Sequence, residues 1–343
     1  MKRCPVSLLL YTSLGALLVS GCSHSLLQLG RAPCSQLPPG MAAEFTYERV
    51  DEVPCKMKVL ENKTQFTIRR IGLAAPSDQP GTNRWIELDY YDLASKEKTP
   101  VVMVLPMLGG GYALERHFAN YFVSRGYAAV IVRRDPRTSS ARVEDLNRLF
   151  KDMVIDHKRV IDWLETQEDI DSKRLGIFGV SMGGIKGALL LPLEDRIKAA
   201  AIGLAGGDLP YILTRTTEPG LTKRREQEMK ERSMTLEQCE ERLRGMLKYD
   251  PLNYAHYVDP KKVLLVLARY DDVVPIEKGL ELKEKMGNPE TIMIPAGHYS
   301  AVLSIPYIKS QSFDFLEKRF AEVSGKTDGK RGGGLTKVQA GRR

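Results

Sequence analysis

The sequence lacks the features that define several common classes of protein. Glycine and proline are scattered without a three-residue period, and no segment repeats at intervals of roughly 20–50 residues. A collagen-like chain is therefore excluded, and solenoids and propellers are disfavoured. There is no phosphate-binding P-loop, no Cys-x-x-Cys pair and no convincing cluster of metal ligands, so we expect neither a cofactor nor a metal.

Positive charge is less widespread than the net value of +8 suggests. Lys2 and Arg3 contribute +2 and residues 325–343 contribute +5, which leaves only +1 for the chain between them. That middle part has no basic stripe, which argues against nucleic acid as a partner. Hydrophobic residues make up 43% of the 343 residues, which is enough for a sizeable core in one large domain or two small ones.

The apolar run over residues 7–19 is too short to cross a membrane as a helix, which needs about 20 apolar residues. Because Lys2 and Arg3 precede it and small residues follow, it is typical of a secretory signal peptide. The next residues, Val19-Ser20-Gly21-Cys22, resemble the lipobox of bacterial lipoproteins. An ordinary signal peptide with a chance cysteine is the alternative.

The lipobox resemblance implies a lipoprotein signal peptide over residues 1–21 and acylation of Cys22 as the new N-terminus. The acyl chains would anchor the protein firmly in a membrane. Residue 23, directly after the cysteine, is serine and not aspartate. By resemblance to lipoprotein sorting in envelopes with two membranes, this favours the outer membrane. We therefore expect a lipid-anchored protein of the cell envelope, on the periplasmic face of the outer membrane.

Three of the five cysteines remain once Cys4 leaves with the signal peptide and Cys22 is acylated. Cys34 and Cys55 are close in sequence, and they either form a disulfide or stay separate thiols. Residues 22–43 are predicted to be a tether to a folded domain over residues 44–324. Residues 325–343, rich in glycine and basic residues, are predicted to be a disordered tail.

Strands and helices alternate from Pro100 onward. Because the strand-like runs are continuously apolar, they predict a mostly parallel sheet with helices on both faces, an α/β fold. The segments at 65–71 and 85–91 predict antiparallel strands before it. The predicted strands of the main part are 101–105, 128–132, 174–179, 199–203, 263–268 and 291–294, and the predicted helices are 113–124, 143–166, 183–191, 276–286 and 310–323.

One stretch, residues 207–260, interrupts this alternation. It contains no convincing core strand, and its mixture of acidic and basic residues favours solvated helices. Thr235-Leu-Glu-Gln238 fits a capping box at the start of one of them. The stretch is either a surface excursion or a small helical cap over a ligand site at the carboxyl ends of the strands.

The sequence Gly179-Val180-Ser181-Met182-Gly183 matches the G-x-S-x-G motif. It falls between a predicted strand and a predicted helix, as a nucleophile elbow requires. Here the sequence resembles the α/β-hydrolase family, over about residues 100–320. The resemblance implies an α/β-hydrolase fold, with the 207–260 stretch as its cap, and Ser181 as the nucleophile.

The family order of the remaining catalytic residues is an acid followed by a histidine. Residues 268–275, Ala-Arg-Tyr-Asp-Asp-Val-Val-Pro, resemble the family's G-x-x-D-x-x-V-P turn and select Asp271, with Asp272 as the alternative. The base is then His298, which follows Pro-Ala-Gly after the last predicted strand. Asp271 would orient the imidazole, and His298 would move the proton of Ser181.

The resemblance also implies two backbone donors for the oxyanion of the tetrahedral intermediate. One is the N–H of Met182, the residue after the nucleophile. The second belongs to the loop after the strand at 101–105, where Pro106-Met107 replaces the His-Gly of many members. Leu108 is the preferred donor in this loop and Met107 the alternative.

These residues predict a serine hydrolase that acts on a small-molecule acyl substrate, foremost a carboxylic-ester hydrolase working through an acyl-enzyme. A peptidase or amidase on the same three residues is the second candidate. The β-rich segment before Pro100 is too short for a peptidase propeller, which disfavours the oligopeptidase architecture. A lipid-anchored binding protein that kept the fold without catalysis is the third candidate.

Overall fold

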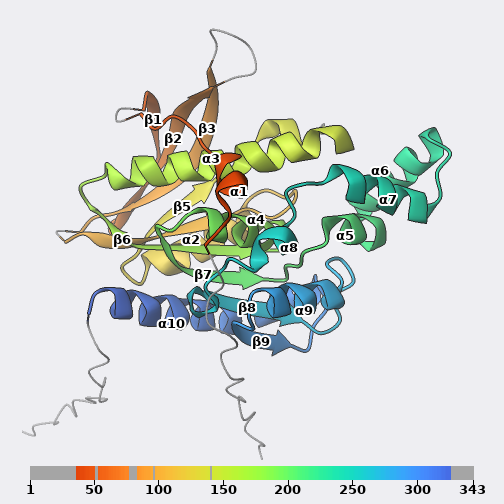
Figure 1. Cartoon of the computed structure of the whole chain (residues 1–343). Coiled ribbons are helices and arrows are strands. Elements are labelled where there is room, and N and C mark those ends of the chain that lie inside the picture. The colour runs from red at the N-terminus through yellow and green to blue at the C-terminus, as the bar shows by residue number, and fades with distance from the viewer. Residues whose placement is uncertain (1–35, 51–52, 77–82, 96, 140, 326–343) are drawn as a thin grey trace, which may run out of the picture.

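The computed structural model describes residues 36–50, 53–76, 83–95, 97–139 and 141–325 (Figure 1). The predicted signal peptide, Cys22, Cys34 and nearly all of the predicted tail lie outside the described residues. No helix within those ranges combines the length and the apolar character needed to span a membrane.

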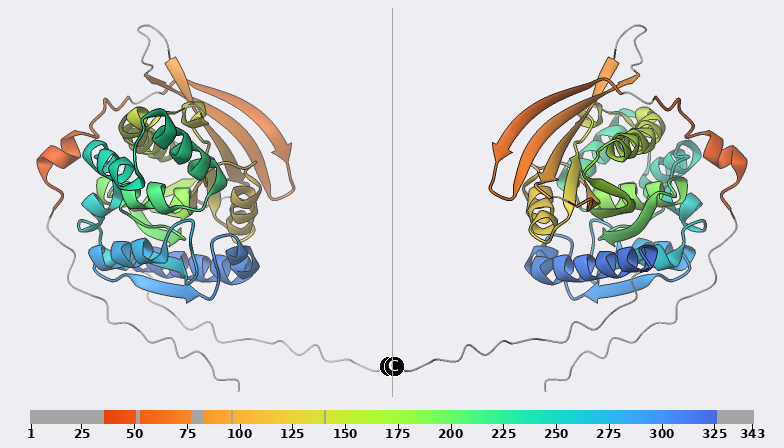
Figure 2. Two further views of the ribbon diagram at one scale, coloured as in Figure 1. Left: turned by 90° about the vertical axis from the view of Figure 1, so that its right-hand side faces the viewer. Right: turned by 90° about the vertical axis from the view of Figure 1, so that its left-hand side faces the viewer.

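The described strands form one nine-stranded sheet in the order β1-β2-β3-β5-β4-β6-β7-β8-β9. Strands β1, β2 and β3 pair in antiparallel fashion, and β3 pairs in the same way with β5. All further pairs along the sheet, from β5–β4 to β8–β9, are parallel. The three N-terminal strands curve away at one edge of the sheet (Figure 2). The bounds are β1 Cys55–Asn62, β2 Phe66–Pro76, β3 Asn83–Leu93, β4 Thr99–Leu105, β5 Ala128–Val132, β6 Ile170–Val180, β7 Ile197–Gly203, β8 Val263–Ala268 and β9 Glu290–Ile294.

Helices cover both faces of this sheet, and each face has its own hydrophobic core. One core lies under α2 and α10, and the other lies under α3, α4, α8 and α9 (Figure 1). This is the α/β-hydrolase fold expected from the sequence. The helices are α1 Pro39–Ala43, α2 Ala113–Val123, α3 Leu146–Glu165, α4 Met182–Leu190, α5 Leu209–Arg215, α6 Pro219–Glu231, α7 Leu236–Met246, α8 Pro251–Ala255, α9 Ile276–Lys285 and α10 Ile305–Val323.

The central strands are the part of the fold that the sequence predicts best, because they are buried on both faces. Every residue of β4, β5 and β8 is buried. Strand β1 was not predicted, and every one of its residues is exposed. An edge strand without a buried face has no alternating pattern to reveal it. Cys55 is exposed at its start; its pairing with Cys34 stays a prediction.

The N-terminal part of the domain reaches further back than residue 44. Helix α1 falls within the predicted tether, and Leu37 and Met41 pack against the larger core. Phe45 is fully buried, with its ring centroid 5.0 Å from that of Tyr249. The structured domain therefore includes the last residues of the predicted 22–43 tether, because Leu37 and Met41 pack against the core of the domain.

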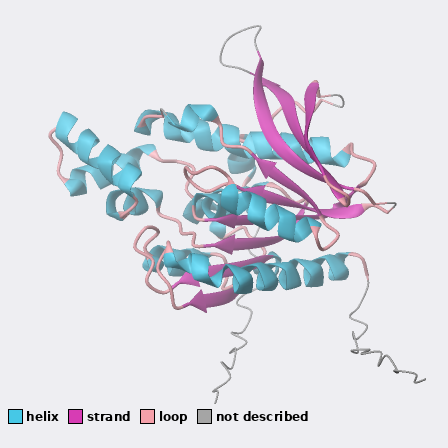
Figure 3. Cartoon of the chain, turned by 180° about the vertical axis from the view of Figure 1, so that it is seen from behind, coloured by secondary structure: helices cyan, strands magenta, loops and turns pink. Residues whose placement is uncertain are grey.

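Residues 207–260 hold helices α5 to α8 and, within the described residues, no strand. The predicted capping box is present: Thr235 Oγ1 accepts from the N–H of Gln238, and Gln238 Oε1 accepts from the N–H of Thr235. Helices α5 to α7 of this insertion lie at the end of the molecule toward which the parallel strands point (Figure 3). The insertion is therefore placed to bound a site at the carboxyl ends of those strands.

Candidate active site

Ser181 occupies the sharp turn between β6 and α4, with φ 55° and ψ −124°. A non-glycine residue at positive φ is strained, and such strain persists only where the surroundings enforce it. Two glycines let the turn close. A Cβ on Gly179 would collide with the backbone of Gly183, and a Cβ on Gly183 would collide with the carbonyl of Leu105. The local sequence thus fixes the serine at the tip of a tight strand-to-helix turn.

Ser181, His298 and Asp271 form a continuous hydrogen-bonded chain. Oγ of Ser181 lies 2.9 Å from Nε2 of His298. Nδ1 of the same ring lies 2.8 Å from Oδ2 of Asp271. The three side chains come from the loops after β6, β9 and β8, which meet at one edge of the sheet. The structure therefore brings together the three residues that the sequence analysis selected.

The loop after β8 distinguishes Asp271 from its neighbour. Oδ1 of Asp271 also accepts from the backbone N–H groups of Val273 and Val274, at 3.1 and 2.9 Å. The carboxylate is thus buried with three donors around it. Asp272 is exposed, and its backbone oxygen accepts from Thr217. Of the two alternatives, Asp271 is the one that contacts His298.

The two expected oxyanion regions have different surroundings. Met182 is the first residue of α4, so its N–H has no acceptor within the helix. The N–H of Met107 donates to Oε1 of the buried Glu115 at 2.9 Å. The guanidinium of Arg134 donates to the carbonyl oxygens of Met107, at 3.1 Å, and Gly110. The loop after β4 is therefore held by side chains from both sides.

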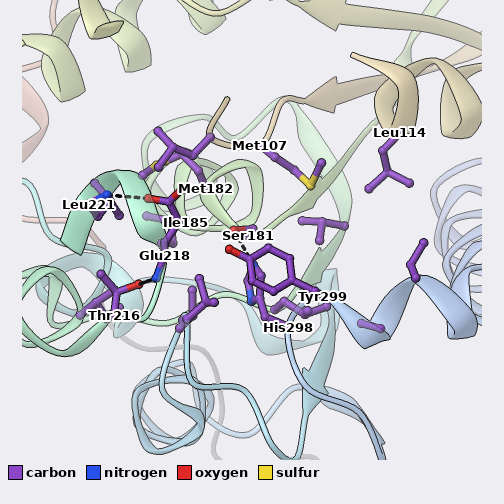
Figure 4. A pocket seen from close by; sticks show the side chains of 18 of the residues that line it. Met107, Leu114, Ser181, Met182, Ile185, Thr216, Glu218, Leu221, His298 and Tyr299 are labelled. Carbon is purple, nitrogen blue, oxygen red and sulfur yellow. Dashed lines mark hydrogen bonds between the residues drawn. The ribbon is translucent and has the colours of Figure 1, made fainter. Parts of the chain in front are cut away.

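A cavity of about 470 Å³ opens over Ser181 and His298 (Figure 4). Its walls are mainly apolar, and the insertion supplies one of them. Glu218 faces the cavity while capping α6, where it accepts from the N–H of Leu221 at 2.6 Å. The residues contributed by the insertion are Leu209, Ile212, Leu213, Thr216, Glu218 and Leu221. Within the described residues, no three His, Cys, Asp or Glu side chains are grouped as metal ligands.

A mostly parallel sheet carrying a strained serine elbow after a central strand defines the α/β-hydrolase class. Residues 114–301, just over half of the chain, match the model of the prolyl oligopeptidase family. The chain belongs to that family and is therefore a serine hydrolase of esterase or peptidase type.

Individual relatives are distant. An uncharacterized protein of Mycobacterium tuberculosis is 28% identical over 155 residues, 45% of this chain and 34% of that protein, so the match spans about a third of the relative. The acetyl xylan esterase of Paenibacillus sp. R4 shares the fold with a TM-score of 0.58 and 15% identity, over 82% of this chain and 100% of that one. The acylaminoacyl peptidase of Pyrococcus horikoshii shares the fold with a TM-score of 0.53 and 16% identity, over 75% of this chain and 42% of that one.

The N-terminal strands lie outside the part of the chain that matches the prolyl oligopeptidase family. The match begins at residue 114, after the N-terminal strands. Among the described residues these strands extend the central sheet and form no propeller. The motifs in the sequence predicted the α/β-hydrolase class but not this family. No motif marks Glu115 of α2, whose carboxylate accepts from the loop after β4.

Proposed function

We propose that this protein is a carboxylic-ester hydrolase in which Ser181, His298 and Asp271 act as nucleophile, base and orienting acid. The observation that carries the proposal is the unbroken contact from Ser181 Oγ through the His298 ring to Asp271, at the wall of an apolar cavity. A nucleophile, a base and a group that orients the base are the parts that acyl transfer requires.

The contacts define the proton path. Because the Asp271 carboxylate only accepts, Nδ1 of His298 carries the proton and Nε2 presents its lone pair to Ser181. As Ser181 Oγ attacks the ester carbonyl, His298 takes its proton, and Asp271 stabilises the imidazolium. His298 then returns that proton to the leaving oxygen, and water hydrolyses the acyl-enzyme by the same steps in reverse order.

The developing oxyanion needs donors, and we propose Met182 and Leu108. Met182 is favoured because its N–H begins a helix directly after the nucleophile. Leu108 is favoured over Met107 because the N–H of Met107 already donates to Glu115. An oxyanion donor of this kind is typically worth about 2.7–4 kcal/mol in kcat.

A peptidase or amidase is the second candidate, because the family includes peptidases by name. Labelling with a fluorophosphonate tests both enzymatic proposals at once: Ser181 is expected to be the labelled serine, and Ser181→Ala to abolish labelling with circular dichroism unchanged. Matched p-nitrophenyl esters and p-nitroanilides then separate esterase from amidase. A non-catalytic binding protein is the conclusion if Ser181 is not labelled and no ester or amide is cleaved.

We also propose that Cys22 is acylated and anchors the enzyme in the cell envelope, on the periplasmic face of the outer membrane. The support is the sequence around it: a short apolar run, small residues and a cysteine at the lipobox position.

A further inference from the structure

A second cavity, of about 520 Å³, adjoins the first. The two share the oxyanion loop residues Met107 and Leu108 and the first residue of α4, Met182. Ser181 and His298 line only the first. A substrate whose carbonyl is placed at Ser181 therefore has space on two sides of the oxyanion loop. The insertion contributes Leu209, Leu213 and Leu221 to both cavities.

Several basic side chains line the second cavity, but its arginines already have partners within the protein. They contact carboxylates or backbone carbonyl oxygens of the protein itself: Arg84 with Asp156, Arg133 with Asp89, Arg137 with Asp135, Arg134 with Met107 and Gly110, and Arg224 with Ala141. Lys186 differs from them. It lines the same cavity and is half-buried, and its Nζ has no hydrogen-bond or salt-bridge partner among the described residues.

Lys186 lies in α4 one helical turn after Met182, about 6 Å further along the helix axis. It is the one charged residue in the otherwise apolar and glycine-rich helix Met182–Leu190. Burial lowers the pKa of its ammonium group to about 8, and the nearby Arg134 acts in the same direction. An anion beside Nζ would offset that loss of hydration and would give the charge its missing partner.

His157 of α3 lines the same cavity and is only 4% exposed. Its Nδ1 lies 2.6 Å from the carbonyl oxygen of Met153, so this nitrogen carries the proton and donates. Burial lowers the pKa of His157 to about 4, which keeps the ring neutral and leaves Nε2 as an acceptor. Nε2 is buried and has no partner in the described structure. A buried acceptor without a donor is costly, and a ligand N–H or O–H would satisfy it.

We propose that the second cavity binds an anionic acyl arm of the substrate, with a carboxylate on Lys186 and a hydroxyl or amide N–H donating to His157. This inference rests on the proposed function, because the acyl arm is the part of an ester that Ser181 would retain when the alcohol leaves. The leaving oxygen must lie beside Nε2 of His298 to receive its proton, and His298 lines only the first cavity. The leaving group is thus assigned to the first cavity, and the acyl arm extends to the second.

The test compares two esters of equal chain length, p-nitrophenyl hydrogen adipate and p-nitrophenyl hexanoate, which differ by a terminal carboxylate. Lys186→Met removes the charge at similar size, Lys186→Arg keeps a charge, and Lys285→Met removes an exposed lysine elsewhere as the control for net charge. We expect Lys186→Met to lower kcat/KM for the adipate ester at least about tenfold, mainly by raising KM. The same variant should change kcat/KM for the hexanoate ester less than about twofold. Lys186→Arg should retain most of the adipate preference.

The outcomes separate this proposal from the proposed function. If the wild type hydrolyses hexanoate and Ser181 is labelled, but Lys186→Met affects both esters equally or neither, the anionic arm is refuted and the esterase stands. If no ester is hydrolysed, binding decides: monoethyl adipate should raise the melting temperature of Ser181→Ala more than ethyl hexanoate does, and Lys186→Met should remove the difference. Equal shifts from these two ligands, of which only the adipate carries a carboxylate, would refute the site independently of catalysis.

Discussion

The backbone N–H of Met107 donates to the buried carboxylate of Glu115 at 2.9 Å. This contact fixes the loop after β4 from one side, while Arg134 holds the carbonyl oxygens of Met107 and Gly110 from the other. Under the proposed function, the same contact leaves Leu108 rather than Met107 as the second oxyanion donor. We therefore expect Glu115 to be a positioning residue, which sets where Leu108 lies without touching substrate.

Replacing Glu115 should impair the chemical step more than binding. Glu115→Ala frees the N–H of Met107 and loosens the loop, so kcat should fall roughly 10- to 100-fold with little change in KM. Glu115→Gln keeps an acceptor oxygen and should retain most of the activity. Steady-state kinetics on p-nitrophenyl hexanoate measures both, and a purely structural role would give two variants equally impaired.

The two adjacent aspartates provide an internal control for the proposed triad. His298→Ala should lower kcat about as much as Ser181→Ala, roughly 10⁴- to 10⁶-fold, because nucleophile and base act as one unit. Asp271→Ala should cost somewhat less, and Asp272→Ala, which alters an exposed side chain, should retain most of the activity. An inactive Asp272→Ala beside an active Asp271→Ala would contradict the assignment.

The glycines of the elbow should tolerate no side chain. Gly183→Ala places a Cβ against the carbonyl of Leu105, so the turn must distort, and we expect a loss of about 3 kcal/mol or more in the free energy of unfolding. Gly245→Ala is the matched control in α7, where nothing lies within 4 Å of the added Cβ. It should stabilise the protein by roughly 0.5–1 kcal/mol. Urea unfolding measures both changes.

Lys186 should destabilise the fold near neutral pH. Its pKa is lowered to about 8 in the folded state, so between pH 8 and its ordinary value of 10.5 the unfolded chain binds more protons than the folded one. This contribution to stability therefore rises with pH across that range. The charged groups acting on the ammonium are Arg134, which lowers its pKa, and Glu115 and Asp135, which raise it; His157 nearby is neutral.

At about pH 7, Lys186→Met should thus be more stable than the wild type by roughly 1–3 kcal/mol. The difference should shrink above about pH 10, where the lysine is neutral in both states. Comparing the two proteins by urea unfolding across this range cancels the titration of the tyrosines. A variant less stable than the wild type at pH 7 would show that Lys186 supports the fold rather than a ligand.

The lipid anchor is testable on the expressed protein. The N-terminal peptide of the mature chain should begin at Cys22 and carry the mass of acyl chains, because a lipobox at residues 19–22 would place cleavage before that residue. Cys22→Ser should move the enzyme from the membrane fraction to the soluble fraction with unchanged specific activity. An unmodified Cys22 in the wild type would refute the anchor.

Site residues that belong to a short sequence motif could be predicted, whereas residues whose roles depend on contacts with distant parts of the chain could not. The turn around Ser181, the acid turn at Asp271 and the loop at His298 each carry a short motif, and the fold brings these motifs together. Glu115 and His157 carry no motif, because their roles depend on contacts between a helix and a distant loop or cavity. Lys186 could have been found from the sequence, because it is a single charge in an otherwise apolar helix.

The insertion leaves the sheet after β7 and returns before β8, so it supplies walls to both cavities without supplying any of Ser181, Asp271 or His298. For directed evolution, residues 209–221 are therefore the segment to randomise. Libraries there should yield enzymes with altered acyl selectivity whose rate of reaction with fluorophosphonate stays close to that of the parent. We therefore expect mutations in this segment to change which substrates are hydrolysed without changing the reactivity of Ser181.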